Sequence, residues 1–513
     1  MAGAPPFVTR RATYNLIIRG GTLFDGTGSP SRELDIAIAG DRIAAIGPNL
    51  ADKGTVEIDA RGLAVAPGFI DIHSHGEGSF ADDPRAESLV RQGLTTIVSG
   101  QDGSSKPIAA MFAALEQLHP AVNVASMVGL GTLRGNVVGQ ADRPATAAEL
   151  ARMTAMVEKA LAQGACGASS GLEYTPGGFA SVAELTALCK PLAARRLPYA
   201  THMRNEDDQL LESIDESIAV ARGARCPLQI SHLKTQGPRN WGKLNDVFAR
   251  VSRARADGLD VAFDRYPYIA YQTGLTNLFP ITSRDGGTDA FLARLDSSTT
   301  APRIREYVLG RIALLGTWDN VMIANVRAAE DKAAEGKRLG AYAQSLGRDP
   351  YELTVELLKR NRANVGMLGF AMSEENLDRI LAHPQGMVCS DGGSFATDGP
   401  TRRGSPHPRG LGSFARVLGR YVRERKALTL EQAIYKMTAF PASRIGITDR
   451  GRLAKGLAAD VVVFDAAKVE DRATFDQPFQ YPVGINVVVV NGTVALRDGQ
   501  RTPRGTGRPL RPS

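Results

Sequence analysis

The sequence predicts an α/β fold: a (β/α)8, TIM-like barrel with a small β-sandwich domain built from both chain ends and an inserted lid segment. Short runs of β-branched and apolar residues alternate with longer stretches of helical spacing, which is the pattern of βα units around a parallel sheet. Most of these runs end in His, Asp or another polar residue. Because such barrels collect their chemistry at the carboxyl ends of the strands, the same pattern predicts where the functional site lies.

The two ends of the chain differ from its middle. Residues 14–62 and 447–496 alternate apolar and polar residues around turn signals such as RGGTLFDGTGSP, which predicts short antiparallel strands. Neither segment alone has enough strands for a stable core. We therefore expect the two segments to pair into one small β-sandwich domain, preceded by an N-terminal extension at residues 1–13.

The middle of the chain, residues 63–446, is expected to form the barrel. Its predicted strands are 65–75, 95–102, 122–129, 164–174, 198–204, 227–234, 259–266 and 386–391. Amphipathic stretches such as 147–162 and 207–222 are its predicted helices. The segment from about 269 to 384 is too long for one connection between strands, so we expect it to be an inserted lid over the barrel mouth.

Composition excludes several classes of protein. Hydrophobic residues make up 43% of the 513 residues and charged residues 22%, which is typical of a globular protein with a buried core. No run approaches the roughly 18 apolar residues that a membrane-spanning helix needs, and the N-terminus lacks the apolar segment of a secretory signal. The four cysteines are widely spaced, which favours reduced thiols in a cytoplasmic protein over a disulfide framework. We expect no membrane partner.

Much of the net charge of +7 lies at the end of the chain. Residues 497–513, RDGQRTPRGTGRPLRPS, contribute +4 of it, from five arginines and one aspartate. Their Gly, Pro and Arg content predicts a disordered basic tail. A nucleic-acid-binding arm is the alternative, but we expect a solvated tail and no nucleic-acid partner. The sequence leaves open whether the chain forms an oligomer.

Several of the seven histidines fall at predicted strand ends. His73 and His75 end the first predicted strand, and residues two apart on a strand point to the same side. His202 ends the fifth, His232 the sixth, and Asp391 the eighth. A single histidine in such a place is more often structural. Four histidines and an aspartate at equivalent ends of different strands predict a site for a divalent metal.

The motifs around these residues resemble the amidohydrolase superfamily of metal-dependent hydrolases and, within it, the N-acyl-D-amino-acid deacylases. The resemblance extends from about residue 14 to 496. The motifs that carry it are PGFIDIHSH, GLEYTPGG, YATHMRNE, ISHLK, DRYPY, CSDGG and PHPRGLGSFARVLGRYVRE. It implies the barrel fold and hydrolysis of a small-molecule N-acylated amino acid.

The resemblance also implies how the metal is held. His202 and His232 would bind a tight zinc, while His73 and His75 would form a second, weaker site. The family's third ligand of the tight site is a cysteine in a GNCG turn after strand two. Here the turn reads GQDG, so we expect Asp102 to replace the thiolate. An oxygen ligand is harder than sulfur, which leaves manganese and cobalt open beside zinc, and two metals become more plausible. Alternatively, Asp102 accepts a hydrogen bond from a ligand histidine.

The predicted chemistry is attack of hydroxide on an amide carbonyl. A divalent metal can lower the pKa of its bound water from about 15.7 to about 7 and can polarise the carbonyl. We expect Asp391 to be both a metal ligand and the catalytic residue. As general base and then general acid, it would accept a proton during the attack and deliver it to the leaving amine.

The family binds the α-carboxylate of its substrate with a Tyr, a Lys and an Arg. The matching residues are Tyr174 in GLEYTPGG, Lys234 in ISHLK and Arg409 in PHPRG. Two cations and a phenol suit a carboxylate. The segment before Arg409 is longer than is usual in the family, so Arg402 and Arg403 compete with it for this role.

Other functions stay open at this point. A hydrolase of cyclic amides usually needs a lysine at the end of strand four, where this chain reads ASSGLEYTPG and offers only Glu173, a weaker candidate for a bridging group. A lactonase or a hydrolase of xenobiotic amides would use the same hydroxide. A non-enzymatic binding protein would be expected to have lost the ligand set. The preference for D-amino acids follows from the resemblance alone.

Overall fold

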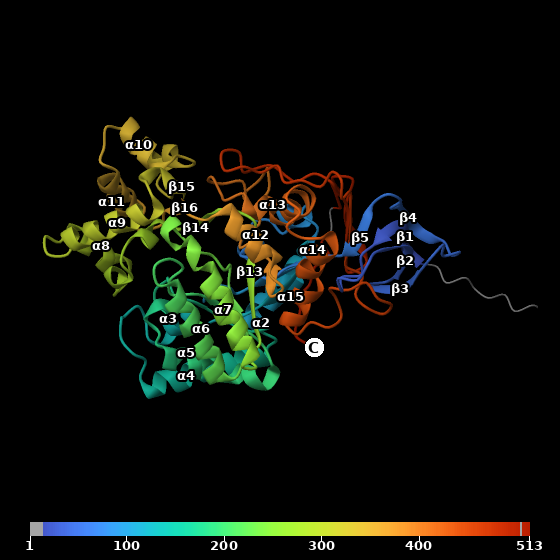
Figure 1. The fold of residues 1–513 in the computed structure, drawn as a ribbon, viewed down its shortest axis with the longest axis horizontal. Helices are drawn as coiled ribbons and strands as arrows, with labels where there is room; N and C mark the ends of the chain where they lie inside the picture. The colour runs from blue at the N-terminus through green and yellow to red at the C-terminus, as the bar shows by residue number, and fades with distance from the viewer. Residues whose placement is uncertain (1–13, 503–504) are drawn as a thin grey trace, which may run out of the picture.

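The computed structural model of the chain describes residues 14–502 and 505–513 and has a parallel barrel near its centre (Figure 1). The barrel strands are β6 (Phe69–Asp71), β7 (Leu94–Ser99), β8 (Asn123–Ser126), β9 (Val128–Gly129), β10 (Ala168–Gly171), β11 (Tyr199–His202), β12 (Leu228–Ile230), β13 (Val261–Arg265) and β17 (Gly386–Val388). They pair in parallel in the orders β6-β7-β8 and β17-β13-β12-β11-β10-β9. Each predicted strand run overlaps at least one of them, and the predicted barrel fold is confirmed.

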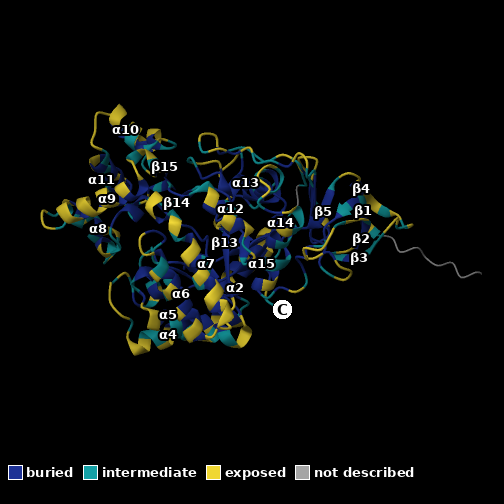
Figure 2. Ribbon diagram, viewed as in Figure 1, coloured by how far each residue is buried: buried dark blue, intermediate teal, exposed yellow. Residues whose placement is uncertain are grey.

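Helices cover the outside of the barrel, and their exposed residues face away from the strands (Figure 2). The helices are α1 (Glu87–Val90), α2 (Ile108–Leu118), α3 (Leu130–Val137), α4 (Ala147–Ala162), α5 (Val182–Cys189), α6 (Leu210–Ala224), α7 (Leu244–Ala256), α12 (Glu374–Ala382), α13 (Arg409–Arg416), α14 (Leu430–Met437) and α15 (Ala439–Arg444). Thr146 begins α4 with a capping box to Glu149. α6 buries Leu210, Ile214 and Ile218 at helical spacing, which fixes the face that packs on the strands. In residues 14–502 and 505–513 we find no helix with the length and apolar content that crossing a membrane requires.

The two ends of the chain meet in one hydrogen-bonded sheet, which lies at the right in Figure 1. Its strands are β1 (Tyr14–Leu23), β2 (Arg32–Ala39), β3 (Arg42–Gly47), β4 (Gly54–Asp59), β5 (Ala64–Pro67), β18 (Val461–Phe464), β19 (Ile485–Val490), β20 (Thr493–Arg497) and β21 (Gln500–Arg501). The join is the antiparallel pair β5–β18, where Val65 faces Val463. The sheet therefore extends past residues 62 and 496, the limits that we predicted for this domain.

The insertion has its own small sheet and helices, at the left in Figure 1. Its elements are β14 (Ala270–Gly274), α8 (Thr288–Asp296), α9 (Ala301–Leu315), β15 (Val321–Asn325), α10 (Leu339–Ser345), α11 (Pro350–Arg360) and β16 (Gly366–Phe370). The strands pair antiparallel in the order β14-β16-β15. A core that includes Leu278, Phe291 and Val308 joins this unit to barrel residues such as Tyr266. The insertion is thus a folded unit that sits beside the barrel.

The end of the chain is ordered where the structure describes it. Residues 497–513 were predicted to be disordered, and for the described residues of this range, 497–502 and 505–513, this is wrong. The Val124 N–H donates to the Arg508 carbonyl at 3.0 Å, and the Leu510 N–H donates to the Val124 carbonyl at 2.8 Å. Leu510 is buried. The segment therefore runs along β8 and adds to the barrel wall.

Glycine, which suggested disorder in this segment, is what permits its close packing. A Cβ on Gly505 would lie 1.9 Å from the His119 carbonyl oxygen, and one on Gly507 would lie 2.0 Å from the Val122 carbonyl oxygen. Such distances are too short for any other residue without a shift of backbone. Composition alone could not reveal this because the partner strand is far away in the sequence.

We predict that removing residues 505–513 lowers the free energy of unfolding by about 2–4 kcal/mol. The truncation removes the buried Leu510 side chain, exposes the apolar surface that it covers, and leaves the Val124 N–H and carbonyl without their hydrogen-bond partners. Urea unfolding followed by circular dichroism measures the effect. Arg497→Ala is the control, since it removes an exposed positive charge and should change stability by at most about 0.5 kcal/mol. A truncated chain as stable as the full chain would show that the segment contributes nothing to the fold.

Candidate metal centre

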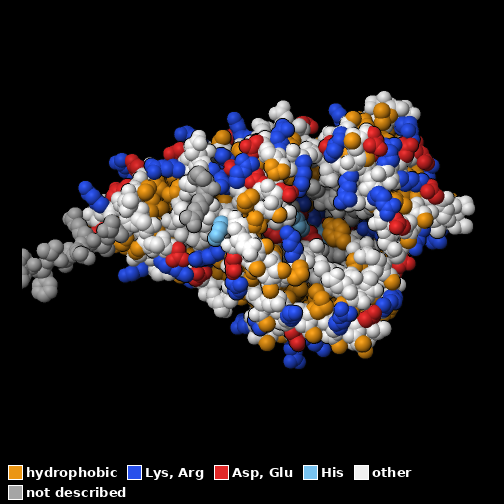
Figure 3. Space-filling view, turned by 180° about the vertical axis from the view of Figure 1, so that it is seen from behind, with side chains coloured by type: hydrophobic (Ala, Val, Ile, Leu, Met, Phe, Trp, Pro, Cys, Tyr) orange, Lys and Arg blue, Asp and Glu red, His pale blue; other side chains and the backbone are white. Residues whose placement is uncertain are grey.

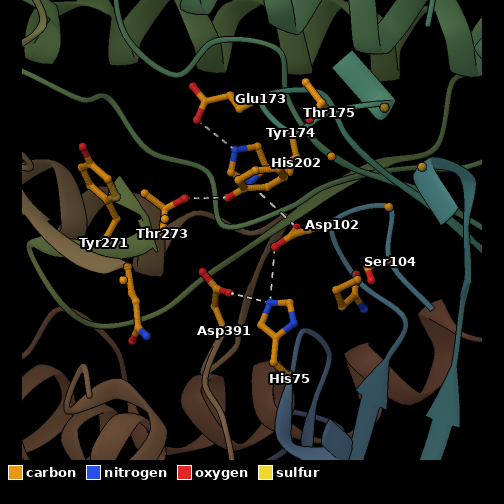
Figure 4. A pocket seen from close by; sticks show the side chains of 18 of the residues that line it. His75, Asp102, Ser104, Glu173, Tyr174, Thr175, His202, Tyr271, Thr273 and Asp391 are labelled. Atoms are coloured by element: carbon orange, nitrogen blue, oxygen red, sulfur yellow. Dashed lines mark hydrogen bonds and ion pairs between the residues drawn. The ribbon is translucent and has the colours of Figure 1, made fainter. Parts of the chain in front are cut away.

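The histidines and aspartates predicted from the sequence meet at one end of the barrel. His73 and His75 follow β6, Asp102 follows β7, His202 ends β11, and His232 comes two residues after β12. Asp391, after β17, joins them (Figure 4). Five of these six residues line a cavity of about 980 Å³. The sixth, His73, is fully buried and does not line it. Figure 3 shows the molecular surface hollowed near the middle of one face, with Lys and Arg side chains around the hollow.

Backbone contacts fix the loops that carry these side chains. The Asp391 N–H donates to the His73 carbonyl at 2.8 Å and the His75 N–H donates to the Gly392 carbonyl at 2.9 Å, so β6 and β17 close the barrel at this point. Asp391, at φ +50°, has a left-handed backbone. So do two others, Asp102 at φ +53° and His232 at φ +37°. Residues with side chains adopt this region rarely, and such strain gathers at functional sites.

The turn GQDG holds Asp102 between two glycines. Gly100 and Gly103 both have positive φ, at +73° and +74°. A Cβ on Gly100 would lie 2.1 Å from the Met127 carbonyl oxygen, and one on Gly103 would lie 2.7 Å from the Gly171 nitrogen. Glycine is therefore required on both sides for Asp102 to reach the centre of the barrel mouth.

One group of ligand atoms surrounds Asp102 Oδ1. His232 Nε2 lies 3.4 Å from this oxygen, and His202 Nδ1 lies 3.9 Å from it. The two ring nitrogens face each other at 3.0 Å. Two nitrogens and one oxygen at this spacing match the donor set of a zinc-type site, where each bond is about 2.0–2.2 Å.

A second group adjoins the first and shares Asp102. His75 Nε2 lies 3.3 Å from Asp102 Oδ2 and 3.2 Å from Asp391 Oδ1. His73 Nε2 lies 3.4 Å from Asp102 Oδ1 and 3.5 Å from Asp391 Oδ1. The carboxylate of Asp102 thus lies between two possible ion positions, which is the place of a bridging ligand.

Buried atoms without partners indicate that this donor set fits a metal. Among the described residues, both ring nitrogens of His73 and Oδ1 of Asp102 have no hydrogen-bond partner. Polar atoms that are buried in proteins are nearly always hydrogen-bonded or bound to an ion. Imidazole nitrogen and carboxylate oxygen are ligands that zinc, manganese and cobalt all accept.

Neighbouring charges set the ionisation of the site. Burial would raise the pKa of Asp102, but the imidazoles, His73 foremost, hold it well below its usual value. Burial opposes protonation of His202, but Glu206, and then Glu173, raise the pKa of His202 to about 9. His202 therefore carries a proton at neutral pH when no metal is bound. Metal binding must release that proton, so metal affinity should rise with pH.

A buried ion pair behind His232 was missing from the sequence-based prediction. Lys234 Nζ lies 2.6 Å and 2.7 Å from the two carboxylate oxygens of Glu206 and 2.7 Å from His232 Nδ1. Glu206 Oε1 is itself 3.2 Å from His232 Nδ1. The pair therefore orients the imidazole whose other nitrogen faces Asp102. Its signal was available: Glu206 ends YATHMRNE, four residues after His202.

Two further carboxylates border the group. Glu173 Oε2 lies 3.3 Å from His202 Nε2, on the side away from Asp102, and accepts a hydrogen bond from the Asn277 amide at 2.9 Å. Asp264 Oδ1 accepts the His232 N–H at 2.7 Å. The sequence alone did not indicate a role for Asp264. Glu173 thus helps to fix the His202 ring, and Asp264 helps to fix the His232 backbone.

Tyr174 and Arg409 also reach the cavity. The Tyr174 ring packs 4.8 Å from the His202 ring, and its hydroxyl oxygen accepts a hydrogen bond from Thr273 at 3.3 Å. Arg409 Nη1 lies 2.6 Å from Asp391 Oδ2. With Lys234, these are the three residues predicted to bind the substrate carboxylate, and all three line the cavity.

The competing arginines lie elsewhere. Arg402 stacks on Phe479, with its guanidinium carbon 5.2 Å from the ring centre, and Arg403 Nη1 lies 3.4 Å from Asp82. Neither lines the cavity. Of the three arginines considered for carboxylate binding, the structure brings only Arg409 to the histidines.

Comparisons with known proteins agree with the geometry. The model of the "Amidohydrolase family" matches residues 56–282 and 390–496. An N-acyl-D-glutamate deacylase of Alcaligenes xylosoxydans xylosoxydans is 39% identical, with 97% of this chain and 96% of the relative covered. A D-aminoacylase of the same organism is 34% identical, with 97% of each covered. A structure of N-acyl-D-glutamate deacylase from Bordetella bronchiseptica, complexed with zinc and a phosphonate inhibitor, gives a TM-score of 0.84 at 36% identity and covers 98% of this chain and 100% of that chain.

We predict that His202→Asn reduces the divalent metal bound per chain to about half of the wild-type amount or less, because one of the three donors of the Asp102–His202–His232 group is lost. Elemental analysis after metal loading and gel filtration measures this. The matched control is His119→Asn, an exposed histidine at the end of α2 with φ +46°, a conformation that Asn also tolerates. Wild-type metal content in the His202 variant would remove His202 from the ligand set.

Proposed function

Because the chain belongs to the amidohydrolase family, we propose that it removes the acyl group from N-acyl-D-amino acids by metal-dependent hydrolysis of the amide bond. The observation that carries the proposal is the meeting of His73, His75, Asp102, His202, His232 and Asp391 around one cavity. The D preference comes from the names of the relatives. The end of β10 offers no lysine for the site of a cyclic-amide hydrolase, which favours a linear amide substrate.

We propose that Asp102, His202 and His232 hold a zinc ion and that His73, His75 and Asp391, with the shared Asp102, complete a second position. When bound, a divalent ion supplies a Lewis acid that polarises the amide carbonyl and acidifies a water molecule. Glu206 and Lys234 keep the His232 ring turned toward Asp102.

Asp391 is the residue proposed to move the proton. Burial would raise its pKa, but Arg409 and then the imidazoles hold the pKa of Asp391 far below its usual value, so it is ionised at neutral pH. A carboxylate in this state can accept a proton from the attacking water and return it to the amine nitrogen. Its side chain is 7% exposed, which keeps bulk water from competing for that proton.

Arg409 links substrate binding to the base. Its guanidinium contacts Asp391 Oδ2 at 2.6 Å in the free chain. A substrate α-carboxylate held by Arg409, with Tyr174 and Lys234 nearby, would share that positive charge. The pKa of Asp391 would then rise toward the operating pH, where a general base is most effective. Binding of the correct substrate would thereby prepare the base.

The four cysteines are buried and form no disulfide, which supports our proposal of a reducing, cytoplasmic location. The substrate we propose is a small molecule that fits the 980 Å³ cavity.

We predict that the zinc-reconstituted chain releases free amine from N-acetyl-D-amino acids and that Asp391→Asn lowers kcat by about 10²- to 10⁴-fold while zinc stays bound at the Asp102–His202–His232 position, of which Asp391 is not a part. The variant keeps the size of the side chain but cannot accept the proton. Asp398→Asn is the control, since this aspartate is 69% exposed and pairs with Arg85.

Paired N-acetyl-D- and N-acetyl-L-amino acids decide the substrate class in the same assay. Release of amine from L-isomers alone would overturn the assignment to D-amino acids. Near-normal turnover by the Asp391 variant would show that another residue moves the proton.

A further inference from the structure

Among the described residues, the insertion contributes one charged side chain, Arg327, to the wall of the cavity. The insertion residues that line the cavity are Tyr271, Gln272, Thr273, Gly274, Asn325, Arg327 and residues 363–366. Apart from Arg327 they are uncharged, and several offer amides or hydroxyls. This wall is therefore polar with a single positive charge, which is a poor environment for a purely apolar substrate group.

A continuous path of contacts leads from the candidate metal ligands to Arg327. Tyr174 packs on His202, and the Thr273 hydroxyl donates to the Tyr174 hydroxyl (Figure 4). Thr273 lies in β14, at the end where Gly274 pairs with Gly366, and Gly366 also pairs with Asn325 in β15. Arg327 follows two residues later. The three strands β14-β16-β15 therefore lead from the Tyr174 contact toward Arg327, and both residues line the same cavity.

The backbone of Arg327 is held firmly. The N–H groups of Arg327 and Ala328 both donate to Asn361 Oδ1 at 2.7 Å. Asn361 is 1% exposed, and its amide nitrogen donates to Asp331 at 2.6 Å and to the Leu357 carbonyl at 2.9 Å. A buried asparagine therefore fixes the base of an exposed arginine, as expected for a group that presents a charge to a ligand.

Of the three Lys and Arg side chains that line the cavity among the described residues, Lys234 and Arg409 each contact a carboxylate and Arg327 does not. Lys234 contacts Glu206 at 2.6 Å, and Arg409 contacts Asp391 at 2.6 Å. Across residues 14–502 and 505–513, no carboxylate oxygen lies within 4.0 Å of the Arg327 guanidinium nitrogens. A guanidinium without a partner in a concave, polar wall favours a carboxylate ligand, which it can bind through two hydrogen bonds.

We propose that Arg327 binds a second carboxylate of the substrate, so that the preferred substrates are N-acyl amino acids with one carboxylate more than the α-carboxylate. This inference rests on the proposed function. The second carboxylate can belong to the amino-acid side chain, as in glutamate, or to the end of the acyl group, as in a succinyl amide. Arg409 would hold the α-carboxylate and Arg327 the other.

The test compares acidic substrates with neutral ones of the same shape. The zinc-reconstituted wild type, Arg327→Gln, Arg327→Lys and the control Arg303→Gln are assayed on N-acetyl-D-glutamate, N-acetyl-D-glutamine, N-succinyl-D-methionine and N-acetyl-D-methionine. Arg303 is an exposed arginine of α9 that does not line the cavity. In Arg327→Gln, KM for one dicarboxylate should rise about 10- to 100-fold with kcat little changed, because a charge-assisted hydrogen bond is lost. Arg327→Lys should retain part of the affinity, and the neutral substrates should change little.

The outcomes separate this inference from the function on which it rests. A loss confined to N-acetyl-D-glutamate places the second carboxylate on the side chain, and a loss confined to the succinyl substrate places it on the acyl group. Unchanged discrimination between acidic and neutral substrates, or an equal loss on both, overturns the role of Arg327 while amide hydrolysis stands. If the wild type hydrolyses none of the four substrates, the proposed function fails and the inference fails with it.

Discussion

The burial of opposite charges around Asp102 is the constraint on which the site depends. Three acids at the barrel mouth, Asp102, Asp391 and Glu206, have side chains no more than 13% exposed. A buried carboxylate without a partner is strongly unfavourable, so each needs a cation or a proton donor from another strand. The imidazoles, Lys234 and Arg409 supply these charges. The ends of β6, β7, β11, β12 and β17 must therefore meet at one level, which links the register of the barrel to the chemistry.

The cavity is lined by residues of both the barrel and the insertion. Barrel loops supply the proposed metal ligands and the proposed base, and the insertion supplies another part of the cavity wall. The two are tied together near the site by the Tyr174–Thr273 hydrogen bond and by a buried ion pair between Arg311 in α9 and Asp207. The proposed catalytic groups are thus fixed by the barrel, while the part of the cavity wall that the insertion supplies can vary with its own sequence. Such a division allows one fold to serve several substrates.

Local patterns predicted the barrel and most of the residues that meet at the candidate site, because alternation of element types and polar residues at strand ends are visible in short windows. His202 and His232 were predictable in this way although they are 30 residues apart. The Lys234–Glu206 pair was not, because the partner of a lysine is decided by packing and not by its neighbours in sequence. The order of residues 505–513 was also missed, since their glycines gain meaning only beside β8. Arg402 and Arg403 could be separated from Arg409 only by their positions in space.

Anomalous diffraction at the zinc absorption edge, from crystals of the zinc-reconstituted chain, tests the metal centre most directly. The account predicts a peak about 2.0–2.2 Å from a ring nitrogen of His202, a ring nitrogen of His232 and a carboxylate oxygen of Asp102. Zinc retained by the protein with its peak away from these three side chains would contradict it.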